Sequence, residues 1–510
     1  MNGRTDDVIV HPMRCAELLQ RIREQGTRQV RIAWADLHGA FRSKTLICGN
    51  GNHHGGSEDY RSGDHGSDSS ALADALQHGV GMVSTLLLKD ASDRTALPVF
   101  EPGSLAALPG FGAANNMVLM PDPESYLTLP WAPGTGWLRA SPVWADGTPV
   151  EADPRRVLQR AVAALNDAGY GLQVGLEVEF HVYRITDARM ATAASAWPAE
   201  PPAVELVHPG YQLLSESHAD AADAVLQIVR DTALGLGLPL GSLEIEFGPS
   251  QFEAVFAPTD ALRAADRMLL FRNGVRQALR RAGYHASFVC RPPFPNAVAS
   301  GWHLHQSLVD AEGANALCGT HAEGDAMDAR RMLSDVGRHW LAGLLAHAAG
   351  MAALCVPSAA GYSRFQGSVM APCAPVWGFD NRGAMLRVVG APGSSATRIE
   401  NRLPEPLANP YLALAAQIAA GLDGLQHGLD PGPATTAPYA ANAAAESGRA
   451  KLPASLPEAL AALAADAVMQ KMLGPSMAVV HAAVRRQELA RQAAADDPEA
   501  WEAAERFGRF

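Results

Sequence analysis

Residues 154–183 read PRRVLQRAVAALNDAGYGLQVGLEVEFHVY, and this stretch decides the fold class. Its first part, Pro154 to Gly169, has proline at the start and glycine at the end, which is typical of a helix. Its second part, Leu172 to Tyr183, alternates apolar and polar side chains, which is typical of a strand. Helical and strand patterns keep alternating further along the chain. The sequence therefore predicts a mixed α/β domain.

The chain of 510 residues is too long for one ordinary hydrophobic core, so we expect two domains. Residues 29–46, QVRIAWADLHGAFRSKTL, read as two strands around the turn DLHGA. They place a small sheet domain at residues 1–144 and leave residues 145–510 to the larger domain. The Pro- and Gly-rich stretch 129–149 is interpreted as the connection between the two.

Two other segments carry specific expectations. Residues 49–70 are rich in Gly, Ser, His and Asp and are predicted to form a flexible surface loop. This composition favours solvated histidines over a metal site at His53, His54 and His65. The apolar stretch 341–356 is too short to span a bilayer and is predicted to be one buried helix.

Composition and charge exclude several classes of protein. A hydrophobic fraction of 48% and a charged fraction of 18% describe a globular protein, and a net charge of −12 argues against nucleic-acid binding. None of the four lysines follows a glycine, so no Walker-type phosphate loop is present. The six cysteines show no C-x-x-C spacing, and the polar start MNGRTDDVIV does not resemble a signal peptide. We therefore expect a cytoplasmic protein with reduced thiols and no membrane partner.

Paired polar side chains mark four strand-like segments, because a strand presents every second residue on the same face. The segments are GLEVEF (Glu177, Glu179), LEIEFGPSQFEAVF (Glu244, Glu246, Glu253), SGWHLHQSL (His303, His305) and TRIENR (Arg398, Glu400, Arg402). Any one pair is more often the solvated face of an edge strand. Together, however, so many carboxylates would repel one another unless cations held them ionised. Oxygen ligands with one imidazole suit Mg²⁺ or Mn²⁺, and hard cations beside arginines suit phosphoryl transfer.

These segments, in this order and spacing, resemble the glutamine synthetase family of ATP-dependent glutamate-amine ligases. The resemblance runs from ADLHGAFRSK near the start to LPASLPEALAAL near the end, and LPEPLANPYLALAAQIAAGLDGL is its most specific stretch. It implies an α+β protein with a β-grasp-like N-terminal domain. The catalytic domain would be α/β, with an antiparallel sheet that forms the active-site funnel. It also implies two or three Mg²⁺ or Mn²⁺ ions per site, ATP as substrate, and a homo-oligomer, most simply a dodecamer of two hexameric rings.

The resemblance assigns roles to individual positions. The ligands of the metal that holds glutamate and the transferred phosphate would be Glu179, Glu246 and Glu253. The ligands of the metal that bridges the ATP phosphates would be Glu177, His303 and Glu400. The nucleotide contacts would be His305, Ser307, Arg387 and Arg398, and the glutamate contacts would be Arg364, Arg402 and Glu179. The catalytic arginines that stabilise phosphate would be Arg382, Arg387 and Arg398, whereas Glu244 matches no ligand.

The chain departs from the family pattern on the acceptor side. Ammonium-using members carry a flap glutamate six residues after the glutamate-gripping arginine, and here that position is Met370. The family's Asn-Gly pair is Val298-Ala299, and Ser395 replaces a nucleotide-site lysine. Asp90 is only a loose match for the aspartate that a neighbouring subunit contributes to the ammonium site. The machinery for ATP and glutamate is thus kept while the machinery for the acceptor is changed.

The leading prediction is a ligase that joins the γ-carboxylate of glutamate to a hydrophobic or aromatic amine such as aniline, with Met370 in the acceptor pocket. Ammonium and alkylamines are cations that need an acid at this place, whereas aniline arrives uncharged. The alternatives are a ligase for polyamine, ethanolamine or alkylamine, and a glutamine synthetase that uses ammonium. A catalytically inactive structural or regulatory member is an alternative of another class. A two-metal hydrolase would leave the arginines without a role.

Overall fold

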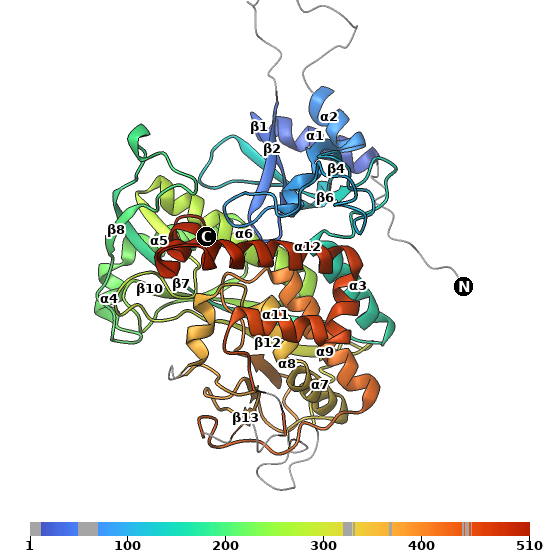
Figure 1. Ribbon diagram of the computed structural model, residues 1–510, viewed down its shortest axis with the longest axis vertical. Coiled ribbons are helices and arrows are strands. Elements are labelled where there is room, and N and C mark those ends of the chain that lie inside the picture. The colour runs from blue at the N-terminus through green and yellow to red at the C-terminus, as the bar shows by residue number, and fades with distance from the viewer. Residues whose placement is uncertain are drawn as a thin grey trace, which may run out of the picture. The chain divides into compact units, whose positions relative to one another are not determined.

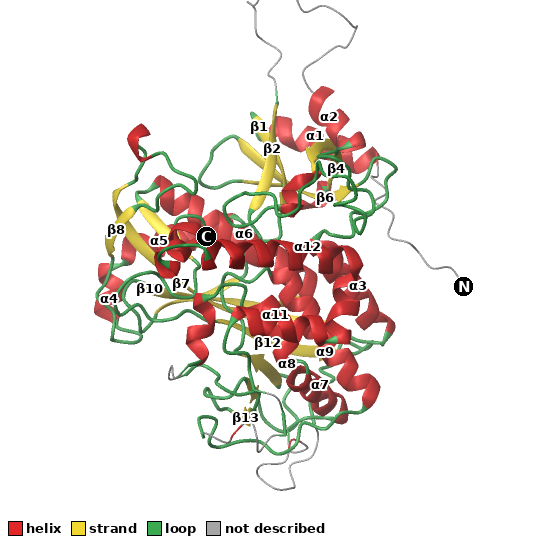
Figure 2. Cartoon of the chain, in the orientation of Figure 1, coloured by secondary structure: helices red, strands yellow, loops and turns green. Residues whose placement is uncertain are grey.

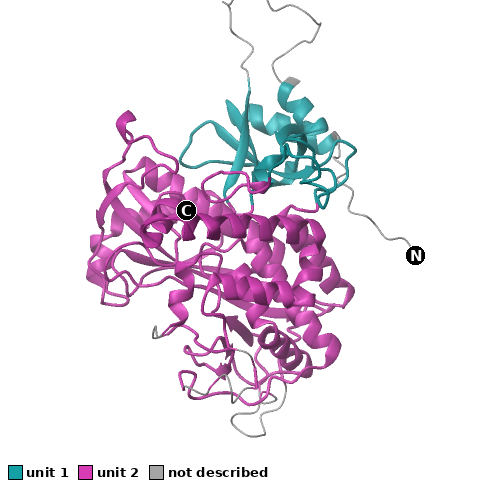
Figure 3. Ribbon diagram, in the orientation of Figure 1, with its two compact units in different colours: residues 1–36, 40–87, 98–150 teal, residues 37–39, 88–97, 151–510 magenta. Residues whose placement is uncertain are grey.

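The computed structural model describes residues 12–48, 70–319, 329, 332–366, 370–440, 443, 448–449 and 451–510. The chain divides into two compact units (Figure 3). Unit 1 comprises residues 1–36, 40–87 and 98–150, and unit 2 comprises residues 37–39, 88–97 and 151–510. The predicted loop at 49–70, with His53, His54 and His65, lies outside the described residues except for Ser70, which begins a helix.

Unit 1 contains a six-stranded sheet in the order β2-β1-β6-β4-β3, with β5 paired to β6. The predicted hairpin is confirmed, because β1 and β2 pair antiparallel with Ala35 opposite Phe41. The elements are α1 (Pro12–Glu24), β1 (Gln29–Ala35), β2 (Phe41–Ile47), α2 (Ser70–His78), β3 (Val80–Val83), η1 (Ser84–Leu88), β4 (Asn116–Pro121), η2 (Pro123–Ser125), β5 (Leu127–Thr128) and β6 (Thr135–Val143).

The interpretation of residues 129–149 as an interdomain connection is wrong. The middle of this stretch is β6 (Thr135–Val143), which pairs in parallel with β1 and antiparallel with β4 in the sheet of unit 1. Trp137 and Leu138 of this strand are buried. The turn residues that suggested a linker precede the strand at Pro133 and Gly134, where Gly134 has a φ of 74°. Proline and glycine here mark the entry to a strand rather than a boundary between domains.

Unit 2 contains a nine-stranded sheet in the order β13-β14-β15-β12-β7-β10-β9, with β8 and β11 also paired to β7. Its strands and helices are intermixed along the chain (Figures 1 and 2), which confirms the predicted α/β character. All strand pairs are antiparallel except β13 with β14. Together with the separate N-terminal sheet unit, this is the α+β architecture expected from the sequence.

The strands of unit 2 are β7 (Gly171–Asp187), β8 (Ala203–Leu206), β9 (Leu240–Ile245), β10 (Gln251–Asp260), β11 (Tyr284–Ser287), β12 (Trp302–Val309), β13 (Trp377–Phe379), β14 (Leu386–Val389) and β15 (Arg398–Asn401). The helices are α3 (Pro154–Asp167), η3 (Thr192–Ala194), α4 (Glu216–Ala221), α5 (Asp223–Gly235), α6 (Ala261–Arg281), α7 (Asp335–Ala346), α8 (Ala348–Cys355), η5 (Ala360–Phe365), α9 (Pro410–His427), α11 (Leu456–Ala465), α12 (Ala467–Ala493), α13 (Pro498–Glu502) and η6 (Ala503–Phe507). In the part of the chain that the structure describes, none of the helices combines the length and the apolar character that crossing a membrane requires.

The two sides of strand β7 differ: one faces the core of unit 2, and the other belongs to the polar face of the sheet. Leu176, Val178 and Phe180 are buried, and α6 packs against β7 and β10. The residues between them, including Glu177 and Glu179, point to the opposite face because side chains alternate along a strand. The same alternation that predicted the strand therefore decides which side carries the acidic residues.

The prediction of one buried helix over 341–356 needs a correction. The segment forms two helices, α7 and α8, that meet at His347. The ring of His347 lies between two carboxylates, with Nδ1 2.8 Å from Asp466 and Nε2 3.0 Å from Asp423. An ionisable side chain that must reach two acids explains why the apolar run is interrupted here.

Candidate active site

The register of the sheet brings the predicted polar residues together on one face. Strands β14, β15, β12, β7, β10 and β9 are consecutive neighbours, and each contributes to this face or to the turn beside it. The cross-strand partners are Arg387 with Glu400, His305 with Glu400, His303 with Glu177, Glu253 with Glu179, and Glu253 with Glu244. Residues as far apart in sequence as Glu177 and Glu400 thus form one row across six strands.

Glu400 is fully buried and is held by two arginines. Arg387 donates from Nη1 to Glu400 Oε2 over 2.9 Å, and Arg402 Nη1 donates to the other carboxylate oxygen. Burial by itself would raise the pKa of Glu400, but the nearby His303 and Arg402 outweigh burial and lower it. The carboxylate is therefore held ionised in the interior.

One of the two arginines expected beside Glu400 lies elsewhere. The strand pattern placed Arg398 and Arg402 on either side of the acid, whereas Arg398 donates from Nε to His305 Nδ1 over 3.1 Å. Arg387, from the neighbouring strand β14, takes the place beside Glu400. A pattern within one strand could not reveal this partner, because the contact depends on which strand lies alongside.

Two histidines of β12 share one carboxylate of β7. His303 Nδ1 lies 3.2 Å from Glu177 Oε2, and His305 Nε2 lies 2.8 Å from Glu177 Oε1. Burial, followed by the charge of Arg402, lowers the pKa of His303 to about 4. His303 is therefore a neutral imidazole at pH 7, which is the form that coordinates metal ions.

The carboxylates at the β10 and β9 end of the row are crowded, and the cations of the protein compensate their negative charge poorly. Burial, followed by the neighbouring carboxylates, raises the pKa of Glu253 to about 10 and that of Glu179 to about 8. Burial also raises the pKa of Glu246. Glu179 is fixed in position by the Gly301 N–H at 2.9 Å and by Gln251 Nε2 at 3.1 Å. Acids that are oriented but not neutralised by protein cations are the donor set that a divalent cation requires.

Two groups in the described part of the chain bring ligand atoms within 4.8 Å of one another. They are Glu177, His305 and Glu400, and Glu177, Glu253 and His303. Four of the six predicted metal ligands belong to these groups, and a fifth, Glu179, lies 3.7 Å from His303 Nε2. His305, predicted as a nucleotide contact, joins the first group. Oxygen-rich groups with imidazole fit Mg²⁺ or Mn²⁺, while the role of each residue stays a prediction.

The remaining predicted residues surround this row. Arg364 is buried and donates to three backbone carbonyls, those of Leu403, Pro404 and Arg402. Arg382 is exposed and contacts no other described residue through a hydrogen bond or an ion pair. Ser307 lies on β12 two residues beyond His305, on the same face. The structure thus brings Arg364 to the site, whereas Arg382 makes no hydrogen bond or ion pair within the described residues.

Met370 occupies the position where the family pattern has an acid. Its backbone N–H donates to the hydroxyl of Tyr439 over 2.8 Å, and its carbonyl accepts from Arg402 Nη2 over 3.1 Å. Met370 is 48% exposed and Tyr439 is 47% exposed. The backbone of Met370 therefore joins the phenol hydroxyl of Tyr439 to Arg402, at the position where the family pattern has an acid.

Asp90, the loose candidate for an acid offered to a neighbouring subunit, is used inside its own chain. It is 1% exposed, and its Oδ2 accepts from Arg491 and Gln487 at 2.8 Å each. The backbone N–H groups of Ser92 and Arg94 donate to its other oxygen. Asp90 therefore stabilises the turn that contains it.

Sequence reasoning missed three residues that shape the site. Gln251 orients Glu179, Asp380 accepts from Arg387 Nε over 2.9 Å, and Tyr439 holds the backbone of Met370. Gln251 carried a weak signal, since it lies two residues before Glu253 in the same strand. Tyr439 carried none, because 69 residues separate it from its partner.

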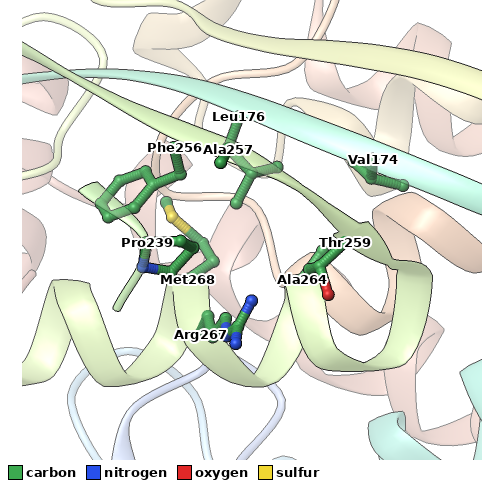
Figure 4. Close-up of a pocket in the computed structure, with 9 residues that line it drawn as sticks. All are labelled: Val174, Leu176, Pro239, Phe256, Ala257, Thr259, Ala264, Arg267 and Met268. Atoms are coloured by element: carbon green, nitrogen blue, oxygen red, sulfur yellow. The ribbon is translucent and has the colours of Figure 1, made fainter. Parts of the chain in front are cut away.

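A small apolar pocket lies on the other side of the sheet and does not belong to this site. Figure 4 shows Leu176 and Phe256 of the strands above Met268 and Arg267 of α6. Its free volume of about 10 Å³ is no more than one water molecule needs. Leu176 alternates with Glu177 on β7, so this pocket belongs to the core and the acidic row faces away from it.

Residues 151–505 match the family described as the glutamine synthetase catalytic domain. The chain belongs to the glutamine synthetase family. It is 35% identical to gamma-glutamylanilide synthase of an Acinetobacter species over 95% of this chain and 92% of that protein. It is also 35% identical to gamma-glutamylethanolamide synthetase of Streptomyces coelicolor, over 72% of this chain and 75% of that protein.

Solved structures of glutamine synthetase relatives agree with this assignment. The GmaS/ADP complex superposes with a TM-score of 0.72 at 27% identity, covering 94% of this chain and 96% of that one. Apo GmaS superposes with a TM-score of 0.72 at 28% identity, covering 95% and 98%. The family predicted from the sequence is therefore confirmed.

Proposed function

We propose that this protein is an ATP-dependent ligase that joins the γ-carboxylate of L-glutamate to an amine through a γ-glutamyl phosphate. The observation that carries the proposal is the row of acids, histidines and arginines that six strands align on one face. Divalent cations would neutralise the charge of the phosphate groups. The residues that would hold these cations are Glu177, Glu179, Glu246, Glu253, His303 and Glu400. A hydrolase would not account for the buried arginines at one end of the row.

The arginines supply the contacts that such a reaction needs. Three N–H groups of Arg364 are fixed by backbone carbonyls, which leaves two of its five donors for the α-carboxylate of glutamate. Arg387 and Arg398 lie where the ATP phosphates are predicted to bind, and their charge stabilises the oxygens of the transferred group. Arg382, exposed and without a hydrogen bond or ion pair to another described residue, would meet phosphate when substrate is bound.

The reaction consists of two balanced steps. A γ-carboxylate oxygen of glutamate attacks the γ-phosphorus of ATP, and the bond from that phosphorus to ADP breaks. The amine nitrogen then attacks the γ-carbonyl carbon, the C–N bond forms, and the C–O bond to phosphate breaks as nitrogen loses a proton. The first step is needed because a free carboxylate does not react with amines, whereas its acyl phosphate carries a good leaving group.

For the acceptor we propose a hydrophobic or aromatic amine, with aniline ahead of isopropylamine, ethanolamine, putrescine and ammonium. Met370 carries a polarizable thioether and Tyr439 an aromatic ring, and both residues are exposed. The backbone of Met370 contacts Arg402 and the Tyr439 hydroxyl, and no acid stands at the Met370 position. An arylamine is uncharged at neutral pH and needs no carboxylate to bind it or to remove a proton before attack. The similarity to gamma-glutamylanilide synthase supports the same choice.

The test is to quantify γ-glutamyl products with a panel of these five amines at equal concentration, ATP, glutamate and Mg²⁺. We expect the highest kcat/KM with aniline. Met370→Glu should shift the preference toward ammonium and alkylamines, whereas Met370→Leu, the matched control, should keep aniline first. A wild-type preference for putrescine or ammonium would contradict the aromatic acceptor. Absence of any product with all five amines would favour the inactive structural member instead.

The predicted homo-oligomer is also a proposal. The family resemblance implies two stacked hexameric rings with active sites between neighbouring subunits. Light scattering on the purified protein should give the mass of twelve chains. A fully active monomer would exclude this assembly.

A further inference from the structure

A cavity of about 520 Å³ lies outside the active site, at the C-terminal end of α6. Its walls come from the last turns of α6, from β11, from the segment 188–202 that follows β7, and from Gly508. The volume falls in the range of small-molecule binding sites. Glu177 and Glu179 lie in the middle of β7, whereas this cavity is next to the end of that strand.

Positive charge dominates the lining of this cavity. Arg276, Arg280 and Arg281 come from α6, and Arg189 comes from the segment after β7. Arg276 and Arg280 are four residues apart, so their side chains lie on the same face of the helix, where like charges repel. The cavity also contains Glu200, which is exposed. This concentration of arginines contrasts with the net charge of −12 of the whole chain.

The three arginines that α6 contributes to the cavity have no hydrogen-bond or ion-pair partner in the part of the chain that the structure describes. Among the described residues, none accepts a hydrogen bond from Arg276, Arg280 or Arg281 or forms an ion pair with them. The Nε atom of Arg276 is buried and has no hydrogen-bond partner. Burial, and then the charges of Arg509 and Arg280, lower the pKa of Arg276 to about 10.

The dipole of α6 explains the placement of only some of these arginines. Arg280 and Arg281 are in the last turn of α6, where cations interact favourably with the negative end of the helix dipole. Arg276 lies a full turn earlier, where the dipole effect has faded, and it is the most deeply placed of the three. Arg276 is partly buried, and its buried Nε has no partner among the described residues, which is costly; an anion in the cavity would reduce that cost.

The walls of the cavity are fixed rather than loose. The indole of Trp197 donates to the carbonyl of Ser92 over 2.7 Å, and Arg94 stacks on the same ring with its guanidinium carbon 4.3 Å from the centroid. These contacts anchor the segment that carries Arg189 and Glu200. On the other side, the backbone of Gly508 packs so closely on Pro201 that an added Cβ would lie 3.2 Å from Pro201 Cα.

We propose that this cavity is a binding site for a small anion with at least two negative charges, of the phosphate-ester or dicarboxylate class. Arg276 and Arg280 bind the charged groups, and Gln277, Asn273 and Tyr284 of the same wall surround the rest of the ligand. Guanidinium groups bind phosphate and carboxylate oxygens in pairs, which suits a ligand with two or more charges. The site is separate from the proposed reaction and does not rest on it.

The test is isothermal titration calorimetry in EDTA at low ionic strength, with inorganic pyrophosphate as the phosphate probe and succinate as the dicarboxylate probe. We expect saturable binding of at least one probe, and the probe that binds identifies the class. The double variant Arg276→Gln/Arg280→Gln should weaken that binding at least tenfold. The matched control Arg230→Gln/Arg263→Gln removes two exposed arginines that pair with Asp231 and Asp260, and should change it less than twofold.

Two further measurements separate this site from the active site and from a structural role. Arg387→Gln should leave probe affinity unchanged, because Arg387 lies in the active site. Without any probe, Arg276→Gln/Arg280→Gln should melt no lower than wild type, because it removes a repulsion. The proposal is overturned if neither probe binds, if the double variant binds as wild type does, if Arg387→Gln alone abolishes binding, or if the double variant melts several degrees lower.

Discussion

Arg387 and Glu400 form a 2.9 Å ion pair in which the carboxylate is completely buried. Replacement of Glu400 by alanine leaves Arg387 and Arg402 without their shared acid and removes a predicted metal ligand. We expect Glu400→Ala to lower turnover at least a thousandfold while the far-UV circular dichroism spectrum stays that of a folded protein. Phosphate release with ATP, glutamate and amine measures the effect. A near-normal rate at ordinary Mg²⁺ would show that Glu400 is not a metal ligand.

Gly301 leaves room that the site needs. A Cβ at this position would lie 2.7 Å from His303 Nε2 and 2.8 Å from Arg364 Nη2, closer than real contacts permit. Gly301→Ala should therefore displace both side chains and lower kcat/KM about a hundredfold. The matched control is Gly241→Ala, where the nearest atom would be 3.5 Å away. Equal activity of the two variants would contradict this account of the site.

Mg²⁺ should stabilise the folded protein through the crowded acids. Glu253 and Glu179 have raised pKa values because burial, and then repulsion from neighbouring carboxylates, disfavour their charged forms. A cation that binds only the folded state adds about 2.7 kcal/mol to the free energy of unfolding at a hundred times its Kd. Differential scanning fluorimetry should show a higher Tm with Mg²⁺ than with EDTA. The Glu253→Gln variant should lose most of that difference, and an unchanged difference would remove Glu253 from the metal site.

His347 should make stability depend on pH. Its bonds to Asp466 and Asp423 outweigh burial and raise its pKa, while Asp466 has a lowered pKa. A raised histidine pKa contributes stability that is fully present below the unfolded value of about 6.5 and is lost as pH rises through the folded value. Urea denaturation should show that His347→Gln costs more free energy of unfolding at pH 6 than at pH 9. His78 forms an exposed pair with Asp74, so His78→Gln is the control. An equal cost of His347→Gln at both pH values would contradict the prediction.

The sequence predicted those features that depend on local periodicity. The strands that carry Glu177, Glu179, His303 and His305 follow from alternation of side chains, and the helix that begins at Pro154 follows from proline at its start and glycine at its end. Which strands are neighbours does not follow from periodicity and came from the resemblance to glutamine synthetase. The acidic row could therefore be predicted in outline before the register was known.

Features that depend on distant partners could not be predicted. Arg387 rather than Arg398 pairs with Glu400 because β14 lies beside β15, and Tyr439 reaches Met370 from a segment without recognisable pattern. The turn that leads into β6 is rich in proline and glycine, a composition that is also typical of a linker. His347 divides an apolar run because Asp423 and Asp466 lie on two other segments of the chain. In each case a contact across the fold outweighs the local signal.

The central claim is that glutamate is activated by transfer of phosphate to its γ-carboxylate. The direct measurement is mass spectrometry of phosphate released from unlabelled ATP when the γ-carboxylate of glutamate carries ¹⁸O and aniline is the acceptor. A γ-glutamyl phosphate intermediate predicts one ¹⁸O atom from glutamate in each phosphate formed, in step with the γ-glutamyl product. Phosphate that contains oxygen from water and none from glutamate would contradict the account.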